Sequence, residues 1–383
     1  MDLNKVFQGD ALSVLKSFPD ECVDCVVTSP PYWGLRDYGV AGQLGLEKTP
    51  EEYVAKLVEV FREVKRVLKS QGTVWLNLGD SYAGSGKGIG SMPDPKWVQA
   101  RNDKNKHETD WDLIGLKSKD LVGVPWRVAF ALQADGWFLR QDIIWSKPNP
   151  MPESVTDRCT KAHEYVFLLA KNQKYFFDNE AIKEKSEWFE KDARAINGRT
   201  PHKSGKSILE ESQYAINGVA YSLDGKRNKR SVWVITTKAF KDAHFAVFPE
   251  DLVEPMIKAG TSQKGVCSTC GKPWERVIEK TSSTRTRKAG ECQDTDIGRQ
   301  GRAGELNTKT LGWRSSCVCG VEPVPAVVLD PFIGSGTTGV VAKKLGRNFV
   351  GVELKPEYVE MATERIRPFK EQTKLMQIIS EVI

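Results

Sequence analysis

The stretch VPAVVLDPFIGSGTTG, residues 324–339, decides the fold. Residues 324–329 are apolar and largely β-branched, as expected of a buried parallel strand, and they run into a glycine-rich turn. Residues 338–345 follow as a predicted helix that Gly346 ends, and residues 348–352 predict a second strand. The stretch therefore predicts a β-α-β unit within an α/β domain.

This unit has the residue spacing of a nucleotide-binding turn. Gly334, Gly336 and Gly339 satisfy G-x-G-x-x-G, and Glu353 lies about 20 residues further on, where a carboxylate can bind ribose hydroxyls. A glycine turn alone would also suit NAD, or a plain connection between a strand and a helix. Only about 30 residues follow Glu353, so the remaining strands of such a sheet have to come from earlier in the chain.

A second motif follows a predicted strand near the other end of the sequence. It reads Ser29-Pro30-Pro31-Tyr32. An aromatic exocyclic amine is a poor nucleophile until acceptors hold its hydrogens. The Ser29 hydroxyl and the Pro30 carbonyl are two such acceptors, and Pro31 restricts the residue before it to extended conformations. Tyr32 offers a flat face to a base rotated out of a duplex, and Trp33 is expected to extend that wall.

The two motifs, in this order, resemble those of the β-class amino-methyltransferases of DNA. The resemblance implies a Rossmann-like, S-adenosylmethionine-dependent methyltransferase fold of the α/β class, circularly permuted, with a DNA-recognition region between the motifs. In that family the glycine turn holds the methionine part of the cofactor, the aromatic residue after Asp-Pro packs against it, and the acidic residue after the next strand binds the ribose. The cofactor-binding residues implied here are Asp330, Phe332, Gly334, Ser335, Gly336, Thr337, Thr338 and Glu353.

A third landmark of that family is a Gly-Asp pair that contacts the cofactor near its adenine. Here Gly9 and Asp10 stand just upstream of the Ser-Pro-Pro-Tyr strand, so the resemblance adds Asp10 to the cofactor set. Asp10 is also placed to cap a helix predicted over residues 11–18.

The expected activity is site-specific methylation of duplex DNA by base flipping and direct in-line transfer. Ser29 at the head of the motif resembles the enzymes that make N4-methylcytosine, whereas adenine-N6 enzymes more often carry Asp there. Adenine-N6 methylation is the alternative, and an RNA or protein-glutamine methyltransferase is a third possibility. A non-catalytic zinc-ribbon DNA-binding protein is the rival from a different class. No cysteine follows a proline, so a covalent ring-carbon mechanism is not expected.

Two cysteine pairs predict a metal site. Cys267 and Cys270 form C-x-x-C, Cys317 and Cys319 form C-x-C, and a glycine follows each pair. Four thiolates paired in this way are typical of a structural zinc site, here within a zinc-ribbon-like insertion. Cys22 and Cys25 also fit C-x-x-C but lie in and beside a predicted core strand, so burial is expected. Cys159 and Cys292 have no assigned role.

The elements above suggest how the chain is divided. The expected parts are a catalytic part at 1–180, a target-recognition region at 181–235, a cofactor part at 236–264 and 321–383, and a zinc-binding insertion at 265–320. Further expected elements are strands at 22–28, 73–80 and 138–145, helices at 50–69 and 122–135, a hairpin of 163–169 with 174–177, and a helical segment at 244–257. Asn77 and Asp80 are expected at the active edge, to bind the base or, for Asp80 equally, to form a turn.

Basic residues gather in two segments that could contact DNA. One is residues 180–230, with Arg194, Arg199, Lys203, Lys206, Lys226, Arg227, Lys229 and Arg230 beside Trp188, Phe189 and Tyr221. The other is the cysteine insertion, with Arg285, Arg287, Lys288, Arg299 and Arg302. Lysine and arginine neutralise phosphates, and arginine can read guanine in the major groove, although such charge is also common in solvated loops.

Bulk properties agree with a globular DNA-modifying enzyme without singling one out. The chain has 383 residues and a net charge of +6, which is only a mild basic excess. It lacks an export signal and any run of roughly 18 apolar residues, so we expect a cytoplasmic protein of prokaryotic, archaeal or phage origin with no membrane partner. Double-stranded DNA is the expected partner; a cognate restriction endonuclease and the oligomeric state are left open.

Overall fold

The computed structural model describes residues 1–34, 39–40, 42–83, 115–185, 226–238, 248–282 and 306–382. Within them the chain forms two compact units. The first comprises Met1–Phe177, Arg230–Pro273 and Cys317–Ile383, and the second comprises Asp178–Lys229 and Trp274–Ser316. The two basic segments considered above thus contribute mainly to the second unit. Both cysteine pairs belong to the first.

An eight-stranded sheet forms the centre of the first unit. Its first five strands run parallel, β5 is antiparallel to its neighbours β3 and β4, and β8 pairs parallel with β4. In spatial order the strands are β1 (Lys5–Gln8), β14 (Asn348–Glu353), β13 (Val327–Asp330), β2 (Val23–Thr28), β3 (Leu68–Leu78), β5 (His163–Ala170), β4 (Phe138–Ser146) and β8 (Val232–Val234).

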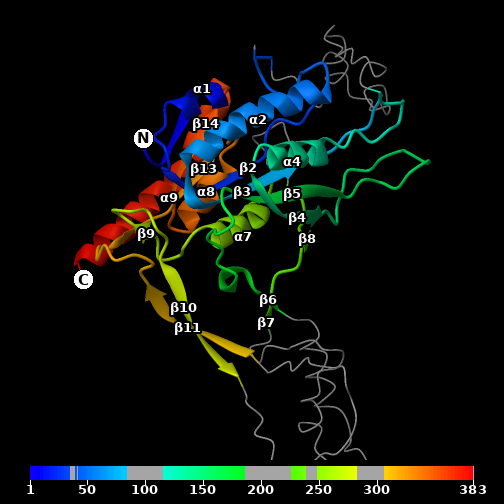
Figure 1. The fold of residues 1–383 in the computed structure, drawn as a ribbon. Helices are drawn as coiled ribbons and strands as arrows, with labels where there is room; N and C mark the ends of the chain where they lie inside the picture. Colours follow the sequence, from blue (N-terminus) through cyan, green and yellow to red (C-terminus); the bar gives the residue numbers. More distant parts are fainter. Residues whose placement is uncertain are drawn as a thin grey trace, which may run out of the picture. The chain divides into compact units, whose positions relative to one another are not determined.

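Helices cover both faces of this sheet (Figure 1). On one face, α1 (Ala11–Lys16), α2 (Pro50–Val67) and α4 (Val124–Ala134) pack against each other and bury a continuous apolar core. On the other face lie α7 (Glu250–Gly260), α8 (Thr337–Lys344) and α9 (Pro356–Val382). The central strands are buried from both sides, which explains their continuous runs of apolar residues.

Local sequence sets the limits of the longest helix of the first face. Thr49 caps α2 by accepting a hydrogen bond from the Glu52 amide at 3.1 Å, and Pro50 occupies the first turn. The helix ends at Val67, because Leu68 is already extended and begins β3. The sequence-based limits were wrong here: residues 68–72 belong to the strand, and Leu68 at its start pairs with Val23 of β2.

The strand predicted over residues 324–329 is in fact two strands. β12 (Pro323–Val324) pairs with β9 (Val266–Cys267), and only β13 enters the central sheet. Pro325 lies between them, and proline lacks the amide hydrogen that a continuous ladder needs. The predicted hairpin of 163–169 with 174–177 was also wrong, because β5 pairs with β3 and β4 and residues 174–177 form no strand.

The second unit is built from short pairings. β10 (Glu275–Ser282) and β11 (Leu306–Arg314) form an antiparallel hairpin, and β6 (Glu184–Lys185) pairs with β7 (Lys226–Arg227) after the 3-10 turn η2 (Glu180–Ile182). Arg276 of β10 forms an ion pair with Asp178 at 2.8 Å, which joins the two chain segments of this unit. None of the helices in the described part of the chain is long and apolar enough to cross a bilayer.

Candidate active site

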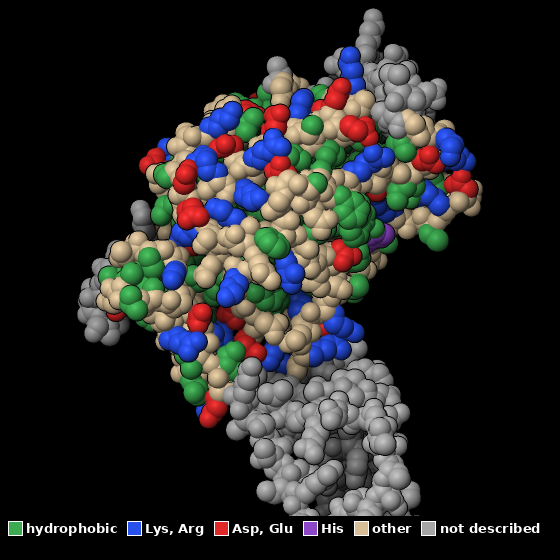
Figure 2. All heavy atoms as spheres, in the orientation of Figure 1, with side chains coloured by type: hydrophobic (Ala, Val, Ile, Leu, Met, Phe, Trp, Pro, Cys, Tyr) green, Lys and Arg blue, Asp and Glu red, His purple; other side chains and the backbone are tan. Residues whose placement is uncertain are grey.

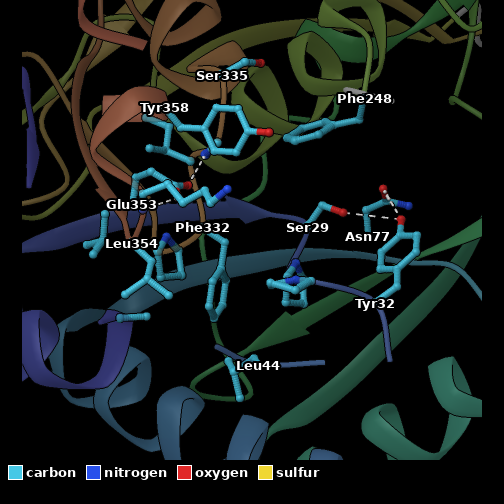
Figure 3. Close-up of a pocket in the computed structure, with 18 of the residues that line it drawn as sticks. Ser29, Tyr32, Leu44, Asn77, Phe248, Phe332, Ser335, Glu353, Leu354 and Tyr358 are labelled. Atoms are coloured by element: carbon cyan, nitrogen blue, oxygen red, sulfur yellow. Dashed lines mark hydrogen bonds between the residues drawn. The ribbon is translucent and has the colours of Figure 1, made fainter. Parts of the chain in front are cut away.

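A cavity of about 380 Å³ opens at the carboxyl ends of the parallel strands in the first unit. Its walls come from the segments that follow β1, β2, β13 and β14, together with the ends of β3, β4 and β5. The carboxyl edge of a parallel sheet is where α/β proteins bind ligands, and the volume falls within the roughly 300–1,000 Å³ of small-molecule pockets. Figure 3 shows its two ends, with Phe332, Glu353 and Tyr358 at one and Ser29, Asn77 and Tyr32 at the other.

The glycine turn after β13 forms part of the first end. Gly334 has φ 49° and Gly336 has φ 88°, a backbone region that favours glycine. A side chain at Gly336 would lie 3.0 Å from Ala362 of α9, so this glycine lets α9 pack against the turn. At Gly334 the nearest atom to an added Cβ is 4.0 Å away, so the backbone is open on the side of the cavity.

Asp330 lies behind the turn rather than on the cavity wall. Its fully buried carboxylate accepts hydrogen bonds from the hydroxyls of Thr28 and Thr338, each at 2.7 Å, and from the Phe332 amide at 3.0 Å. Burial raises the pKa of Asp330 to about 6, and these three donors oppose the rise. This carboxylate therefore fastens the end of β2 to the glycine turn and to α8.

Other predicted cofactor residues fall into two groups. Phe332, Gly334 and Ser335 line the cavity, whereas Gly336, Thr337 and Thr338 lie behind it and are covered by α9 and the sheet. Arg365 of α9 donates to the side chains of Ser335 at 3.2 Å and of Thr337 at 2.9 Å.

Two carboxylates face the first end of the cavity. Glu353 accepts hydrogen bonds from the amides of Gly334 at 3.1 Å and Lys355 at 2.9 Å, and burial raises its pKa. Asp10 caps α1 by accepting from the Ser13 amide at 2.9 Å, as the sequence predicted, and it lines the cavity as well.

The second end of the cavity is a network of polar side chains. Ser29 donates its hydroxyl hydrogen to the Tyr32 hydroxyl at 3.3 Å, and the Tyr32 hydroxyl lies 2.7 Å from Glu164 Oε2 and 3.1 Å from Asn77 Oδ1. Asn77 Nδ2 donates to the same Glu164 oxygen at 3.2 Å. Lys147 forms an ion pair with the other carboxylate oxygen of Glu164.

The ring of Tyr32 is held closely. A Cβ at Gly79 would lie 2.6 Å from the ring atom Cε2, so only glycine leaves room for this tyrosine. Burial, and then the charge of Glu164, raise the pKa of the Tyr32 hydroxyl well above its ordinary value, so it remains protonated at neutral pH. The Tyr53 hydroxyl donates to the Pro31 carbonyl at 2.8 Å, which fixes the backbone of the motif, and Pro30 lines the cavity.

Two expectations for this end need revision. Trp33 does not extend the wall for a base, because it is 3% exposed and its indole N–H donates to the Glu47 carbonyl in the core. Of the two roles considered for Asp80, the structural one holds, since its carboxylate accepts from the amides of Gly123 and Val124 at 3.0 Å and so caps α4.

Glu164 and Lys147 also line the second end, and Leu354 and Tyr358 line the first; no motif in the sequence marked these residues as part of the site. Glu164 stands near the start of β5, and an antiparallel strand begins at the edge where its parallel neighbours end. Correct pairing of β5 with β3 places Val166 opposite Asn77 and therefore puts Glu164, two residues earlier, on the same face of the sheet diagonally across from Asn77, so the orientation of one strand was the missing signal.

The four predicted cysteine ligands come together. The sulfur atoms of Cys267, Cys270, Cys317 and Cys319 all lie within 4.8 Å of one another. The Cys270 amide donates to the Cys267 sulfur at 3.4 Å, and the β9–β12 pairing brings the two chain segments together. Cys25, by contrast, is wholly buried in β2 as expected, and Cys22 is half-buried beside it.

The predicted DNA-contacting segments are described only in part. Residues 186–225 and 283–305, with most of the basic residues named above and with Cys292, lie outside the described residues, as do residues 244–247 of the predicted helical segment. In the second unit, Arg227 pairs with Glu184 at 2.9 Å. On the face shown in Figure 2, basic and acidic side chains are interspersed over the described surface.

Comparison with known proteins gives concordant matches. The DNA methylase family of the N6/N4 type matches residues 23–268 and 322–364. The chain is 39% identical over 373 residues to Type II methyltransferase M.Cfr9I of Citrobacter freundii, covering 97% of this chain and 90% of the relative. It is 38% identical over 366 residues to Type II methyltransferase M.SmaI of Serratia marcescens, covering 94% and 90%. Among solved structures, the fold is similar to that of PvuII DNA methyltransferase (cytosine-N4-specific), with a TM-score of 0.50, 17% identity and coverage of 97% and 94%.

Proposed function

This chain belongs to the N6/N4 DNA methylase family, and from that premise we propose that it methylates the N4 amine of a cytosine in duplex DNA with S-adenosylmethionine as donor. One observation carries the proposal: a single cavity joins the glycine turn after β13 to the Ser-Pro-Pro-Tyr segment after β2. A methyl donor at one end and a base at the other would meet without crossing solvent. The non-catalytic DNA-binding alternative gives no reason for this cavity.

The first end has the groups that S-adenosylmethionine requires. Glu353 and Asp10 are acceptors for hydroxyl and amine hydrogens, Phe332 and Tyr358 offer rings for apolar contact, and Gly334 leaves the turn open to close approach. When bound, the donor supplies an electrophilic methyl group on a sulfonium centre. Asp330, Thr337 and Thr338 have the supporting role of holding the turn in place.

The second end suits an amine on a flipped base. The Ser29 hydroxyl and the Pro30 carbonyl accept its two hydrogens, which favours a pyramidal, nucleophilic nitrogen, and Pro31 fixes where that carbonyl points. A base reaches this depth only when it leaves the duplex stack. Tyr32, anchored by its hydroxyl, presents a rigid ring beside the base and pre-orients the amine for in-line attack.

Cytosine is favoured over adenine for two reasons. A hydroxyl at position 29 is a weaker acceptor than the carboxylate typical of adenine-N6 enzymes. Lys147, a donor, also lines the second end, and the Watson–Crick edge of cytosine presents two acceptors, N3 and O2, where that of adenine presents only N1. Adenine-N6 methylation stays the alternative activity.

The strand order supports a circularly permuted methyltransferase fold. β13, which carries the glycine turn, lies beside β2 in the middle of the sheet although most of the chain separates them in sequence. A nucleotide-binding sheet ordinarily begins, in the sequence, with the strand that leads into its glycine turn. In this chain that strand comes after the Ser-Pro-Pro-Tyr motif.

A structural zinc ion is part of the same proposal. Four thiolates within 4.8 Å of each other match a tetrahedral tetracysteine site, and the N–H to sulfur bond at Cys267 is of the kind that stabilises a bound thiolate. We expect about one zinc per purified chain by elemental mass spectrometry, strongly reduced in Cys267→Ser and unchanged in Cys159→Ser, which alters an exposed cysteine elsewhere. Cobalt substitution should give the visible bands of tetrahedral thiolate coordination; a metal-free native protein with four reactive thiols would refute the site.

The cellular setting follows from the activity. We propose that the enzyme acts on double-stranded DNA in a prokaryotic cytoplasm and protects sites from a cognate restriction endonuclease. The curated relatives are Type II methyltransferases, which supports this setting.

The activity is tested directly by product analysis. The full chain is incubated with duplex DNA and methyl-labelled S-adenosylmethionine, and the DNA is digested to nucleosides for mass spectrometry. N4-methyldeoxycytidine is the expected product; N6-methyldeoxyadenosine would support the alternative, and unmodified DNA from folded protein would overturn the proposal.

A further inference from the structure

Three side chains at the second end of the cavity form a directed chain of hydrogen bonds. Ser29 donates to the Tyr32 hydroxyl at 3.3 Å, and that hydroxyl in turn reaches Glu164 at 2.7 Å. The shorter contact ends on a carboxylate, which is the stronger acceptor of the two available to the tyrosine. The hydrogen bonds therefore lead from Ser29 to the negative charge of Glu164, which also lines the cavity. Figure 3 shows the first of them, between Ser29 and Tyr32.

The proposed reaction needs such an exit for a proton. An exocyclic amine that gains a methyl group carries a positive charge until it loses one hydrogen. A serine hydroxyl is a poor base at neutral pH, so it can take that proton only if its own proton moves on. Neither Asn77 nor the Pro30 carbonyl can keep a proton, whereas Glu164 can.

We propose that Ser29, Tyr32 and Glu164 form a proton relay, with Glu164 as the terminal acceptor; this inference rests on the amine methylation proposed above. The carbon–sulfur bond of the donor breaks as the carbon–nitrogen bond to the amine forms. One amine proton passes to Ser29 Oγ, the Ser29 proton to the Tyr32 oxygen, and the Tyr32 proton to Glu164. The products are a neutral methylated amine, a thioether and a protonated Glu164, so charge and atoms balance.

Neighbouring side chains hold the carboxylate of Glu164 in place. Lys147 pairs with its other oxygen and lies 4.3 Å from the centre of the Trp145 ring, which confines the lysine. Lys161 also faces this carboxylate, and its own ammonium group donates to the Asp80 carbonyl at 2.6 Å. Asn77 steadies the shared oxygen by donating to it at 3.2 Å. Both lysines therefore contribute to the charge environment of the acceptor.

The relay is tested by single-turnover rates of methyl transfer at saturating donor. We expect Tyr32→Phe, which keeps the ring, and Glu164→Gln each to lower the rate by roughly 10²-fold or more. The double variant should be no slower than the slower single variant, because either change interrupts the same path. Glu51→Gln, which removes a surface carboxylate that pairs with Arg127 and does not line the cavity, is the matched control and should keep the wild-type rate.

The pH profile separates a relay from a purely structural role. The wild-type rate should fall toward low pH, because a relay cannot deliver a proton to an acceptor that already holds one, and Glu164→Asp should keep this dependence at a reduced rate. Glu164→Gln should be slow but lack that limb. Wild-type rates in Tyr32→Phe, fully additive losses in the double variant, or an unchanged pH limb in Glu164→Gln would each overturn the relay.

A failed relay can be told apart from a failed function. If wild-type protein makes no methylated amine at all, the proposed function falls. If it makes the product and the variants behave like wild type while binding the donor normally, only the relay falls.

Discussion

The two ends of the cavity are built on different principles. The donor end is made mostly by one local unit, in which backbone glycines and buried contacts of Asp330 shape a turn between β13 and α8, and Asp10 is added from the start of α1. The base end is made by side chains from strands far apart in the sequence, such as Tyr32 and Glu164, which are 132 positions apart. A short sequence motif is enough to predict local backbone geometry. A network of side chains from distant segments can be predicted only when the neighbours of each strand are known.

The largest expected effect lies at the base end. Ser29→Ala removes one acceptor for the amine and the first group of the network, so we expect methyl transfer to slow by roughly 10²- to 10³-fold. Donor affinity, measured by calorimetry, should change by less than about twofold, because the Ser29 hydroxyl bonds to Tyr32 at the other end of the cavity. If this variant lost donor binding, the two ends of the cavity could not have the separate roles of binding the donor and binding the base.

The next effect concerns Asp330, which ties the two ends together. Its pKa of about 6 in the folded state exceeds the ordinary value of 3.8, so folding favours the protonated form. The stability it contributes is fully present below about pH 4 and is lost as the pH rises through about 6, by about 3 kcal/mol at most.

Asp330→Asn, which cannot ionise, should lack this contribution to the pH dependence. Urea unfolding at pH 5 and pH 8 measures the difference, and the variant should lose less stability between these values than the wild type. Equal losses in the two proteins would show that this carboxylate does not titrate as its burial implies.

The smallest of the three effects lies at the donor end. Phe332→Ala removes one ring from the cavity wall, so the dissociation constant for S-adenosylmethionine should rise about 10- to 100-fold, as expected for losing about 1.5–3 kcal/mol of apolar contact. The rate at saturating donor should stay within about threefold of wild type. A large fall in that rate, with unchanged affinity, would mean that Phe332 serves the base end instead.

The sequence was a better guide to one end than to the other for a physical reason. The β-α-β unit, the cap at Asp10 and the proximity of the four cysteines could be predicted, because glycine spacing, capping and cysteine pairs act over short stretches. Pro325 indicates a break between two strands, but the apolar residues around it favoured the prediction of a single strand.

Glu164 could not be found in the same way. Its role depends on the antiparallel direction of β5, and apolar residues in a buried strand do not specify direction. Trp33 illustrates the converse error: its position beside Tyr32 suggested a shared wall, but its side chain enters the core. Two neighbouring residues in the segment after a strand can point in different directions, so their being adjacent in the sequence does not place their side chains on the same wall.

The position of β2 beside β13 also has a consequence for biosynthesis. Thr28 and Asp330 bond to each other across 302 positions, so one edge of a buried, apolar strand has no partner until nearly the whole chain has left the ribosome. At a synthesis rate of about 5–20 residues per second, that wait lasts roughly 15–60 seconds. The nascent protein is therefore most open to misassembly during elongation, and chaperones that shield exposed strands should raise its yield.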